Sequence, residues 1–468
     1  MPENPAARWL KLLCKERLGS DEPGDASDGR SPFQRDFDKI VFSSAFRRLQ
    51  DKTQVFPFSE SDYVRTRLTH SIEAASVGRS LGTLVGKKLV DKYQLRCTEE
   101  IRADDLGALV AAACLAHDIG NPPFGHSGEA AIRHWFKTSP LAGEILNDLD
   151  DAHKQDFTQF EGNTQGFRLL TRLQHYRDQG GMHLTYAVLS TFTKYPRASL
   201  CHNPFPKDSA SYKKHGFFLA EQPYFEEVAR ATGLYERLRS VAWQRHPFAF
   251  LVEAADDICY HINDLEDGYR LKYISFERTN ELLLELCDED KEPSVREIAR
   301  QEPTDEEKRK EQIEKLRAIT INTLVKSVAE TFWSNETEIL DGDYDRDLVR
   351  DIPQKQRAGL EEILEVEQRE IYKARPVLEI EAAGFEVLGG MLDLFVTAVT
   401  DKARNKKPSA RSEKLLDLLP DQFLGKDRKA DEDPYTRLLR ITDYICGMTD
   451  SYAVSTYRKL RGISLPHS

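Results

Sequence analysis

The apolar positions of this chain recur mostly at the spacing of a helix face. After residue 32, Phe37, Ile40 and Val41 begin a pattern with steps of three and four residues, which indicates an amphipathic helix. The same pattern predicts helices over residues 64–92, 106–116, 221–238, 247–265, 353–372 and 385–399. The helix over 64–92 is expected to bury Leu68, Ile72, Ala75, Val77 and Leu81. Few stretches alternate as strands do, so the predicted fold class is all-α.

Composition narrows the class of protein. The formal charge of −12 and the pI near 5.6 argue against a generic nucleic-acid binder, whose footprint is usually basic. The seven cysteines are scattered without a CxxC pair, which is typical of reduced thiols. No secretory signal pattern is visible, and the apolar run over 106–116 is too short to span a bilayer. We therefore expect a cytoplasmic protein with no membrane partner.

The strongest chemical signal lies in residues 113–129. The apolar run ends at the adjacent pair His117 and Asp118, and a turn broken by glycine and proline then leads to His126 and Glu129. A spacing of three places the last two side chains on one helical face. An imidazole beside a carboxylate can bind a divalent ion that activates water, and a second His and Glu can move its protons. A His-Asp pair alone, however, is more often structural.

Two distant residues strengthen the hypothesis of a metal site. His70 lies in a predicted helix just after Arg65 and Arg67, and Asp256 lies in the predicted helix over 247–265. Together with His117 and Asp118 they form a set of four nitrogen and oxygen ligands. Such a set suits one divalent ion such as Mn, Mg or another first-row transition metal.

Four phrases in this order resemble a known family. They are FRRLQDKTQVF at 46–56, TRLTHS at 66–71, HDIGNPPFGH at 117–126 and FEGNTQ at 160–165. The chain is similar here to the dGTP triphosphohydrolase (dGTPase-like) family of the HD-domain metal-dependent phosphohydrolases. The resemblance covers roughly residues 30–275. It implies an HD-domain helical fold with additional C-terminal helices. The chain would consist of an N-terminal segment over 1–31, a catalytic domain over 32–275 and a helical C-terminal region over 276–468. The C-terminal region would complete the substrate pocket and the oligomer contacts.

The resemblance also implies roles for individual residues. The metal ligands would be His70, His117, Asp118 and Asp256. His126 and Glu129 would be the catalytic pair, one handling the attacking water and the other the departing sugar oxygen, without an indication of which does which.

Substrate contacts follow from the same resemblance. Arg67, Lys194 and Lys214 would bind phosphate. Tyr260 would pack on the deoxyribose, and Asp264 with Gln54 would bind its 3′-hydroxyl. Asp256, Tyr260 and Asp264 are spaced i, i+4 and i+8, so they share one helix face.

Two positions depart from the vertebrate relatives. Asn121 stands where those relatives carry another histidine, and Asp257 stands where a lysine follows their metal aspartate. The vertebrate scheme of nucleotide activation therefore cannot be carried over. The bacterial dGTPase-like branch fits better.

The sequence thus predicts a metal-dependent dNTP triphosphohydrolase, with dGTP one candidate substrate, that releases deoxynucleoside and tripolyphosphate by attack of water on the α-phosphorus. One alternative is an HD-type nucleotidase or phosphodiesterase. Another is a regulatory protein that responds to single-stranded nucleic acid such as single-stranded DNA, through the basic loop predicted over 401–414. Relatives assemble as hexamers or tetramers, so a homo-oligomer is expected. The preferred base and the native metal stay open.

Overall fold

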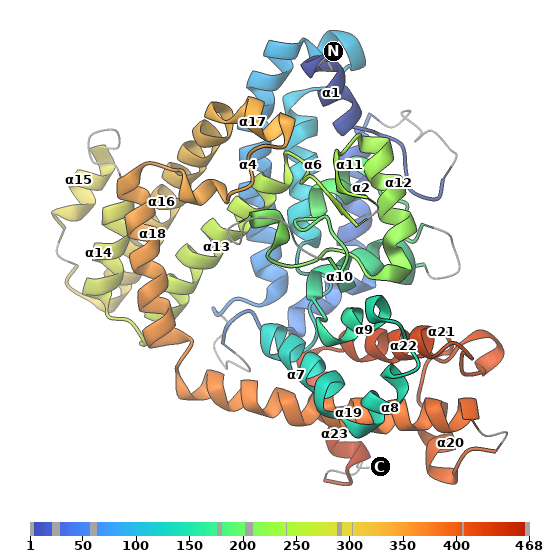
Figure 1. The fold of residues 1–468 in the computed structure, drawn as a ribbon. Helices are drawn as coiled ribbons and strands as arrows, with labels where there is room; N and C mark the ends of the chain where they lie inside the picture. The colour runs from blue at the N-terminus through green and yellow to red at the C-terminus, as the bar shows by residue number, and fades with distance from the viewer. Residues whose placement is uncertain are drawn as a thin grey trace.

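The computed structural model describes residues 4–20, 29–56, 63–175, 180–201, 209–239, 241–287, 293–301, 303–404 and 407–463. Over these residues the fold is helical (Figure 1), which confirms the all-α prediction. Among them the only sheet is the antiparallel hairpin of β1 (Glu236–Leu238) and β2 (Ala242–Trp243).

The described helices range from single turns to long helices such as α4, α16 and α19. The first third contains α1 (Pro5–Leu12), α2 (Pro32–Val41), α3 (Ser44–Arg47), η1 (Arg48–Asp51), α4 (Arg67–Tyr93), α5 (Leu95–Glu99), α6 (Ala103–Ala116), α7 (Gly125–Thr138), α8 (Pro140–Leu146), α9 (Asp151–Thr158), α10 (Gly162–Arg168) and the π-helical turn η2 (Leu169–Leu173). The middle contains α11 (Tyr186–Phe192), η3 (Ala210–Tyr212), η4 (Leu219–Glu221), α12 (Gln222–Thr232), α13 (Ala249–Arg270), α14 (Phe276–Leu286), α15 (Pro293–Ala299), α16 (Glu306–Ser334), α17 (Glu336–Asp341) and η5 (Leu348–Arg350). The last part contains α18 (Gln354–Val366), the π-helical turn η6 (Glu367–Ile371), α19 (Arg375–Arg404), α20 (Ala410–Asp417), α21 (Asp421–Leu424), η7 (Lys426–Arg428), α22 (Pro434–Cys446) and α23 (Asp450–Leu460).

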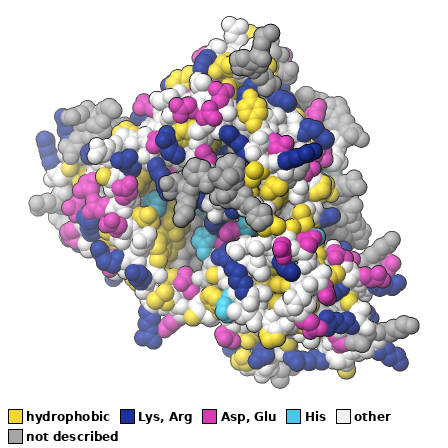
Figure 2. All heavy atoms as spheres, in the orientation of Figure 1, with side chains coloured by type: hydrophobic (Ala, Val, Ile, Leu, Met, Phe, Trp, Pro, Cys, Tyr) yellow, Lys and Arg dark blue, Asp and Glu magenta, His cyan; other side chains and the backbone are white. Residues whose placement is uncertain are grey.

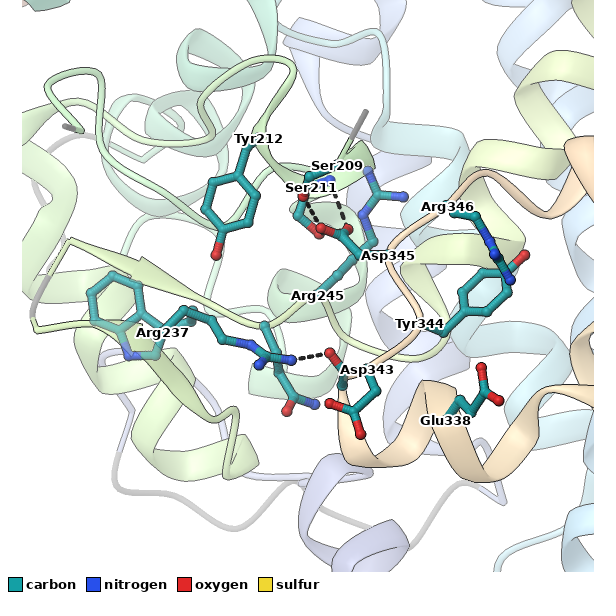
Figure 3. A pocket seen from close by; sticks show the side chains of 13 residues that line it. Ser209, Ser211, Tyr212, Arg237, Arg245, Glu338, Asp343, Tyr344, Asp345 and Arg346 are labelled. Carbon is teal, nitrogen blue, oxygen red and sulfur yellow. Dashed lines mark hydrogen bonds between the residues drawn. The ribbon is translucent and has the colours of Figure 1, made fainter. Parts of the chain in front are cut away.

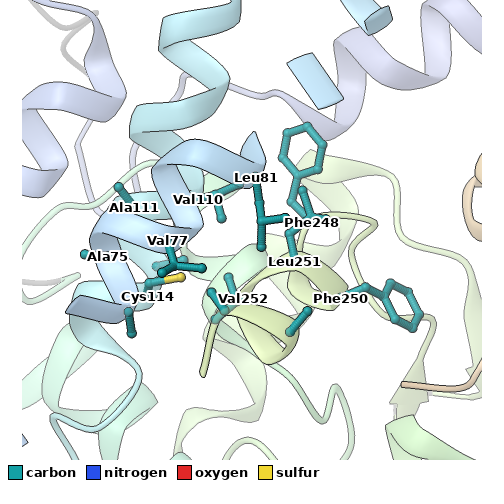
Figure 4. Packing of buried hydrophobic residues seen from close by; sticks show 14 of the residues in the cluster. Ala75, Val77, Leu81, Val110, Ala111, Cys114, Phe248, Phe250, Leu251 and Val252 are labelled. Atoms are coloured by element: carbon teal, nitrogen blue, oxygen red, sulfur yellow. The ribbon is translucent and has the colours of Figure 1, made fainter. Parts of the chain in front are cut away.

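The larger core is built around α4, α6 and α13. Helix α4 starts at a capping box in which Thr66 and Thr69 each satisfy the backbone of the other, as such sequences favour. Side chains of α4 and α6 meet between the helices, and Leu251 and Val252 of α13 pack against them (Figure 4). These three helices carry the predicted metal ligands, so this core fixes their relative positions.

A second core lies beside the first. It joins α7, α8 and α9 to α19, α20, α22 and α23, and Figure 1 shows α19 extending below α7. By length and composition α19 is apolar enough to cross a membrane, but 56% of its most apolar window is buried inside the protein. Its contacts with α7, α20 and α22 are those of a core helix. Segments more than two hundred residues apart thus share this core.

Three predictions of local structure are wrong. The helix predicted over 221–238 ends at Gly233, which adopts a φ of +67°, and the chain then enters β1. The basic segment over 401–414 is largely helical, since α19 continues to Arg404 and α20 begins at Ala410; residues 405–406 lie outside the described residues. Ile72 is 51% exposed, whereas Ala75, Val77 and Leu81, which were expected on the same face of α4, are buried.

Candidate active site

His70, His117 and Asp256 converge at the centre of the larger core. His70 lies in the first turn of α4, His117 caps the C-terminus of α6, and Asp256 lies on α13. The Nε2 atoms of His70 and His117 lie 3.1 and 3.2 Å from the same Asp256 oxygen. Potential ligand atoms of the three residues all lie within 4.8 Å of one another. Three residues from distant parts of the chain therefore form one compact donor cluster.

The imidazole of His117 is oriented for coordination. Its Nδ1 lies 2.6 Å from the carbonyl oxygen of Cys114, and because a carbonyl can only accept, Nδ1 carries the proton. The lone pair then resides on Nε2, which faces the cluster. Metal-binding histidines commonly donate their other ring N–H to a carbonyl oxygen in this way, and this hydrogen bond fixes the tautomer.

Asp118 lies beside this cluster and has two other partners. One carboxylate oxygen accepts a 2.7 Å hydrogen bond from Arg67, and the other accepts a 2.6 Å bond from Asn121. The second oxygen is also 3.4 Å from His117 Nε2. Burial alone would raise the pKa of Asp118, but Arg67 and His117 hold it well below its ordinary value. Asp118 is therefore ionised.

Asp256 is ionised for similar reasons. Burial would raise its pKa, but Lys194 and His117 hold it well below the ordinary value, and Lys194 Nζ lies 2.5 Å from its second oxygen. Burial would lower the pKa of His117, yet Asp118 and Asp256 raise it overall. Two ionised carboxylates thus lie beside the two imidazoles, and each is also paired with a cationic side chain. Two imidazole nitrogens with two ionised carboxylates form a donor set that fits a divalent first-row ion.

His126 and Glu129 lie together at the start of α7. His126 Nδ1 is 3.2 Å from one oxygen of Glu129, whose other oxygen accepts a 2.6 Å bond from the backbone N–H of Gly162. Burial would raise the pKa of Glu129, but these bonds and nearby Lys214 lower it to about 2. The Glu129 side chain is 2% exposed and that of His126 is 71% exposed. Glu129 is thus a buried anion that orients an accessible imidazole.

A cavity of about 310 Å³ joins these groups. His117, Asp118 and Asp256 lie in its wall, and the other predicted residues that line it are Arg67, Gln54, His126, Lys194, Lys214 and Tyr260. Figure 2 shows histidine side chains near the middle of this face of the molecule, beside charged side chains. The structure therefore brings most of the predicted site into one cavity. His70, Glu129 and Asp264 lie behind its wall.

The three predicted phosphate contacts differ in their present partners. Arg67 is buried against Asp118, and Lys194 pairs with Asp256. Lys214 lies 3.1 Å from Glu161. All three line the cavity. A ligand in the cavity would therefore lie beside three cationic side chains, each of which is now paired with a carboxylate.

Near Tyr260, at one end of the cavity, packs a residue that no motif indicated. Tyr372 donates a 3.1 Å hydrogen bond to Asp264, and its ring centre lies 6.1 Å from that of Tyr260. Asp264 therefore supports the wall through Tyr372. Tyr372 follows the π-helical turn η6, and no motif near it pointed to the site. Asn163, Tyr195 and Asp257 also line the cavity. Of these, only Asn163 lay in a recognised phrase.

Backbone contacts hold the loop between α6 and α7. Asp450, at the start of α23, accepts hydrogen bonds of 2.9 Å from the N–H groups of both Phe124 and Thr53. Lys52 donates to the carbonyl oxygens of Asn121 and Cys446. Phe124 has a φ of +65°, a strained value for a bulky residue. The C-terminal region therefore fixes the turn that leads to His126.

A second cavity, of about 400 Å³, lies between the β1–β2 hairpin and residues 342–346 (Figure 3). Ser209 and Ser211 bond to Asp345 in its wall, and Arg237 donates to the carbonyl oxygen of Gly342. Arg245 connects this region to the first cavity, because its Nε donates a 2.7 Å bond to the carbonyl oxygen of Lys194. It therefore helps to hold the lysine beside Asp256.

Comparisons with known proteins agree with this geometry. Residues 67–160 match the HD domain, and residues 351–459 match the phosphohydrolase-associated domain. A deoxyguanosinetriphosphate triphosphohydrolase-like protein of Synechocystis is 44% identical over 98% of this chain and 100% of its own length. A protein of the same name from Pseudomonas aeruginosa is 39% identical over 98% of this chain and 99% of its own. The deoxyguanosinetriphosphate triphosphohydrolase of Salmonella paratyphi A is 32% identical over 92% of this chain and 94% of its own. The HD match contains three of the four predicted metal ligands. The chain therefore belongs to the deoxyguanosinetriphosphate triphosphohydrolase-like family of HD-domain hydrolases.

Proposed function

We propose that this protein hydrolyses deoxynucleoside triphosphates, dGTP among them, to a deoxynucleoside and inorganic tripolyphosphate. The observation that supports this best is the cavity itself. It places the histidine and aspartate cluster beside Arg67, Lys194 and Lys214, with Tyr260 and Gln54 also in the wall. A triphosphate needs concentrated positive charge, and a deoxyribose can pack on an aromatic ring.

We assign the metal site to His70, His117, Asp118 and Asp256. A divalent ion such as Mn or Mg would supply Lewis-acid polarisation and a water of lowered pKa. Asp118 joins the three clustered donors in this assignment because its oxygen lies 3.4 Å from His117 Nε2. Arg67 and Lys194 neutralise these carboxylates and extend positive charge toward the phosphates.

His126 is the proton-handling residue in this proposal. Its Nδ1 faces Glu129, so Nε2 is free to hold the proton that the 5′-oxygen needs when it leaves the α-phosphorus. Glu129 has both oxygens engaged and lies behind the cavity wall, which makes it a positioning residue that stabilises the imidazolium. Tyr260 excludes a 2′-hydroxyl by packing on C2′, while Asp264, through Tyr372, and Gln54 define the end of the pocket that receives the 3′-hydroxyl.

Product analysis tests the proposal. The purified protein is incubated with each dNTP and Mn or Mg in water enriched in ¹⁸O, and the products are resolved by phosphorus NMR and mass spectrometry. We expect deoxynucleoside, and tripolyphosphate that carries the ¹⁸O, because water attacks phosphorus rather than carbon. Pyrophosphate with nucleoside monophosphate would contradict the position of cleavage. Hydrolysis of a monophosphate or a cyclic nucleotide in place of dNTP would favour the nucleotidase or phosphodiesterase alternative.

A further inference from the structure

A row of hydrogen-bonded polar side chains lies behind the end of the catalytic cavity at Tyr260. Its four members come from α13 and from the end of η6, and they are Asp264, Tyr372, Glu367 and His261. The carboxyl groups are buried, since Asp264 is 2% and Glu367 0% exposed. Glu367 and His261 have no part in the chemistry assigned above. A buried acid and a histidine beside a substrate pocket therefore need an explanation.

Local structure brings the four side chains together. The π-helical turn η6 closes with a 2.9 Å hydrogen bond from the N–H of Tyr372 to the carbonyl oxygen of Glu367, five residues earlier. Residues five apart in an α-helix face different sides, but here the Tyr372 hydroxyl lies 3.4 Å from Oε2 of Glu367. On α13, His261 and Asp264 are three residues apart and share one face. Turns of the π type often occur at functional sites.

Two carboxyl groups in this row share one hydroxyl group. The Tyr372 oxygen lies 3.1 Å from Oδ2 of Asp264 and 3.4 Å from Oε2 of Glu367. A hydroxyl has a single proton, so it can donate to only one of them. If both carboxyl groups were ionised, the other contact would bring two acceptors together. A proton on one carboxyl group gives every contact a donor.

The neighbouring cations indicate which carboxyl group is neutral. Glu367 has a cationic partner, because Nδ1 of His261 lies 3.0 Å from its Oε2. Among the residues that the structure describes, Asp264 makes no ion pair. Arg65 also acts on Asp264, but it is already paired with three other carboxylates, those of Glu73, Glu266 and Asp267.

The pKa shifts have the same direction as this geometry. Burial, and next the charges of Glu367 and Asp267, hold the pKa of Asp264 well above its ordinary value. Burial also raises the pKa of Glu367, but the hydrogen bond from His261 opposes that effect. Burial would lower the pKa of His261, whereas Glu367 raises it overall. One buried anion is thus paired with an imidazolium, and a second buried anion would have no such partner.

We propose that Glu367 and His261 are positioning residues for the sugar end of the catalytic cavity, and that they keep Asp264 there as a neutral carboxylic acid. In this arrangement Asp264 donates to the hydroxyl of Tyr372, and Tyr372 donates to Glu367. The row of donors fixes the ring of Tyr372, whose centre lies 6.1 Å from that of Tyr260 in the cavity wall.

A neutral Asp264 suits the ligand that the cavity would hold. An ionised carboxylate at this end would repel a triphosphate, and burial would weaken the screening of that repulsion. A fixed Tyr260 would hold its ring against the deoxyribose. The effect on sugar recognition rests on the proposed function, whereas the charge of Asp264 does not.

Infrared spectroscopy tests the charge of Asp264 in the full chain without nucleotide. The C=O stretch of a protonated carboxyl group is separate from the carboxylate bands, so a difference spectrum between wild type and Asp264→Asn should contain it. Asp267→Asn is the matched control on the same helix. At pH 8 Asp267 is ionised, because burial raises its pKa only to about 6, and its variant should keep the band. The proposal fails if the band persists in Asp264→Asn or if Asp267→Asn removes the same band.

Nuclear magnetic resonance of protein labelled with ¹⁵N-histidine gives a second measurement, in which Asp264 stays in place. The signals of His261 are identified by their loss in His261→Gln. Near neutral pH we expect both ring nitrogens of His261 to carry protons in the wild type and one of them to lose its proton in Glu367→Gln. A neutral His261 ring in the wild type would overturn the ion pair.

Kinetics tests the positioning role. Glu367→Gln keeps the size of the side chain but removes its charge. We expect KM for dGTP to rise about tenfold, the scale of one hydrogen bond to a charged group, with a smaller change in kcat. The preference for dGTP over GTP should fall, because Tyr260 is held less firmly against the sugar. Glu365→Gln, at an exposed position of α18, should change neither quantity.

The two kinds of failure can be told apart. If Glu367 only supports the fold, Glu367→Gln lowers the folded fraction but leaves KM and the preference for dGTP unchanged, and this result would overturn the positioning role. If the wild type does not hydrolyse dGTP, the proposed function fails instead. The infrared and resonance measurements would still decide the charge of Asp264.

Discussion

His126 and Glu129 divide the work of one proton transfer between an accessible group and a buried one. Glu129 accepts from Nδ1 of His126 and stabilises the imidazolium that holds the second proton on Nε2. Gln has no negative charge to stabilise this imidazolium, so His126 would be a poorer proton donor to the leaving oxygen. Both His126→Ala and Glu129→Gln should lower kcat by about 10²–10⁴-fold. Metal content, measured by mass spectrometry, should not change.

The same helix offers a control for these variants. His134 lies on α7 but is exposed and packs against Phe385 rather than lining the cavity. His134→Ala should retain normal turnover. Full activity of Glu129→Gln would show that the buried carboxylate does not stabilise the imidazolium, and lost metal in either variant would assign the pair to the metal site instead.

Lys52 makes stability depend on pH in a defined direction. Burial, with the charge of Arg48, lowers its pKa in the folded state from 10.5 to about 7. Between pH 7 and 10.5 the unfolded chain therefore binds the extra proton, and the stability that Lys52 contributes rises with pH in this window, by up to about 1.4 kcal/mol per pH unit. Below pH 7 Lys52 is protonated in both the folded and the unfolded chain. Its contribution to the free energy of unfolding is then constant and at its lowest value.

The measurement is the difference in Tm between the wild type and Lys52→Met from pH 6.5 to 9.5. That difference should move in favour of the wild type as pH rises. The two carbonyl bonds lost in the variant add an offset that does not vary with pH. Lys87→Met, at an exposed position, should give a flat line, and a flat line for Lys52→Met would mean that the lysine keeps an ordinary pKa.

At the scale of elements, glycines set the distance between α4 and α6. Gly78, Gly82 and Gly86 recur every four residues on one face of α4. A methyl group at Gly82 would lie 2.7 Å from the carbonyl oxygen of Leu106 and 2.9 Å from Val110. Because α4 carries His70 and α6 ends at His117, this close packing also sets the width of the metal site.

Gly82→Ala should therefore lower the free energy of unfolding by about 1–3 kcal/mol and weaken Mn binding in a calorimetric titration. Gly143→Ala is the matched control, since a methyl group there meets nothing within 4 Å and alanine favours the helix. If the two variants are equally stable and bind Mn equally, the glycine spacing does not control the site.

The sequence could predict the elements that carry the chemistry, because periodicity and phrase order are local signals. Helices α4, α6 and α13 were expected close to their observed bounds. On the buried face of α4, Ala75, Val77 and Leu81 were expected correctly and Ile72 was not, and the glycines of that face carry no hydrophobic signal. The hairpin β1–β2 was missed for a related reason, because Gly233 ends α12 within an apparently helical pattern.

At the scale of the whole molecule, the active site lies where the two cores meet. Helix α7 carries His126 and Glu129 but packs in the second core with α19, while the metal cluster belongs to the first. Tyr372 and Asp450 reach the site from the region that matches the phosphohydrolase-associated domain. Such contacts depend on pairs of residues separated by hundreds of positions, and one sequence holds no periodic signal for them.

Asp450 provides the test of this long-range support. It is 1% exposed and holds Thr53 and Phe124 with charge-assisted bonds, each worth about 1.5–3 kcal/mol. Asp450→Asn keeps the shape but loses charge and one acceptor, so it should lower stability by about 2–3 kcal/mol. Since Asp450 does not line the cavity, kcat per folded molecule should fall about tenfold as the turn before His126 loosens, with KM changed much less. Asp417→Asn, at an exposed position of α20, should change neither quantity. If Asp450→Asn loses stability but keeps the full kcat of its folded fraction, the C-terminal region supports the fold without positioning the catalytic loop.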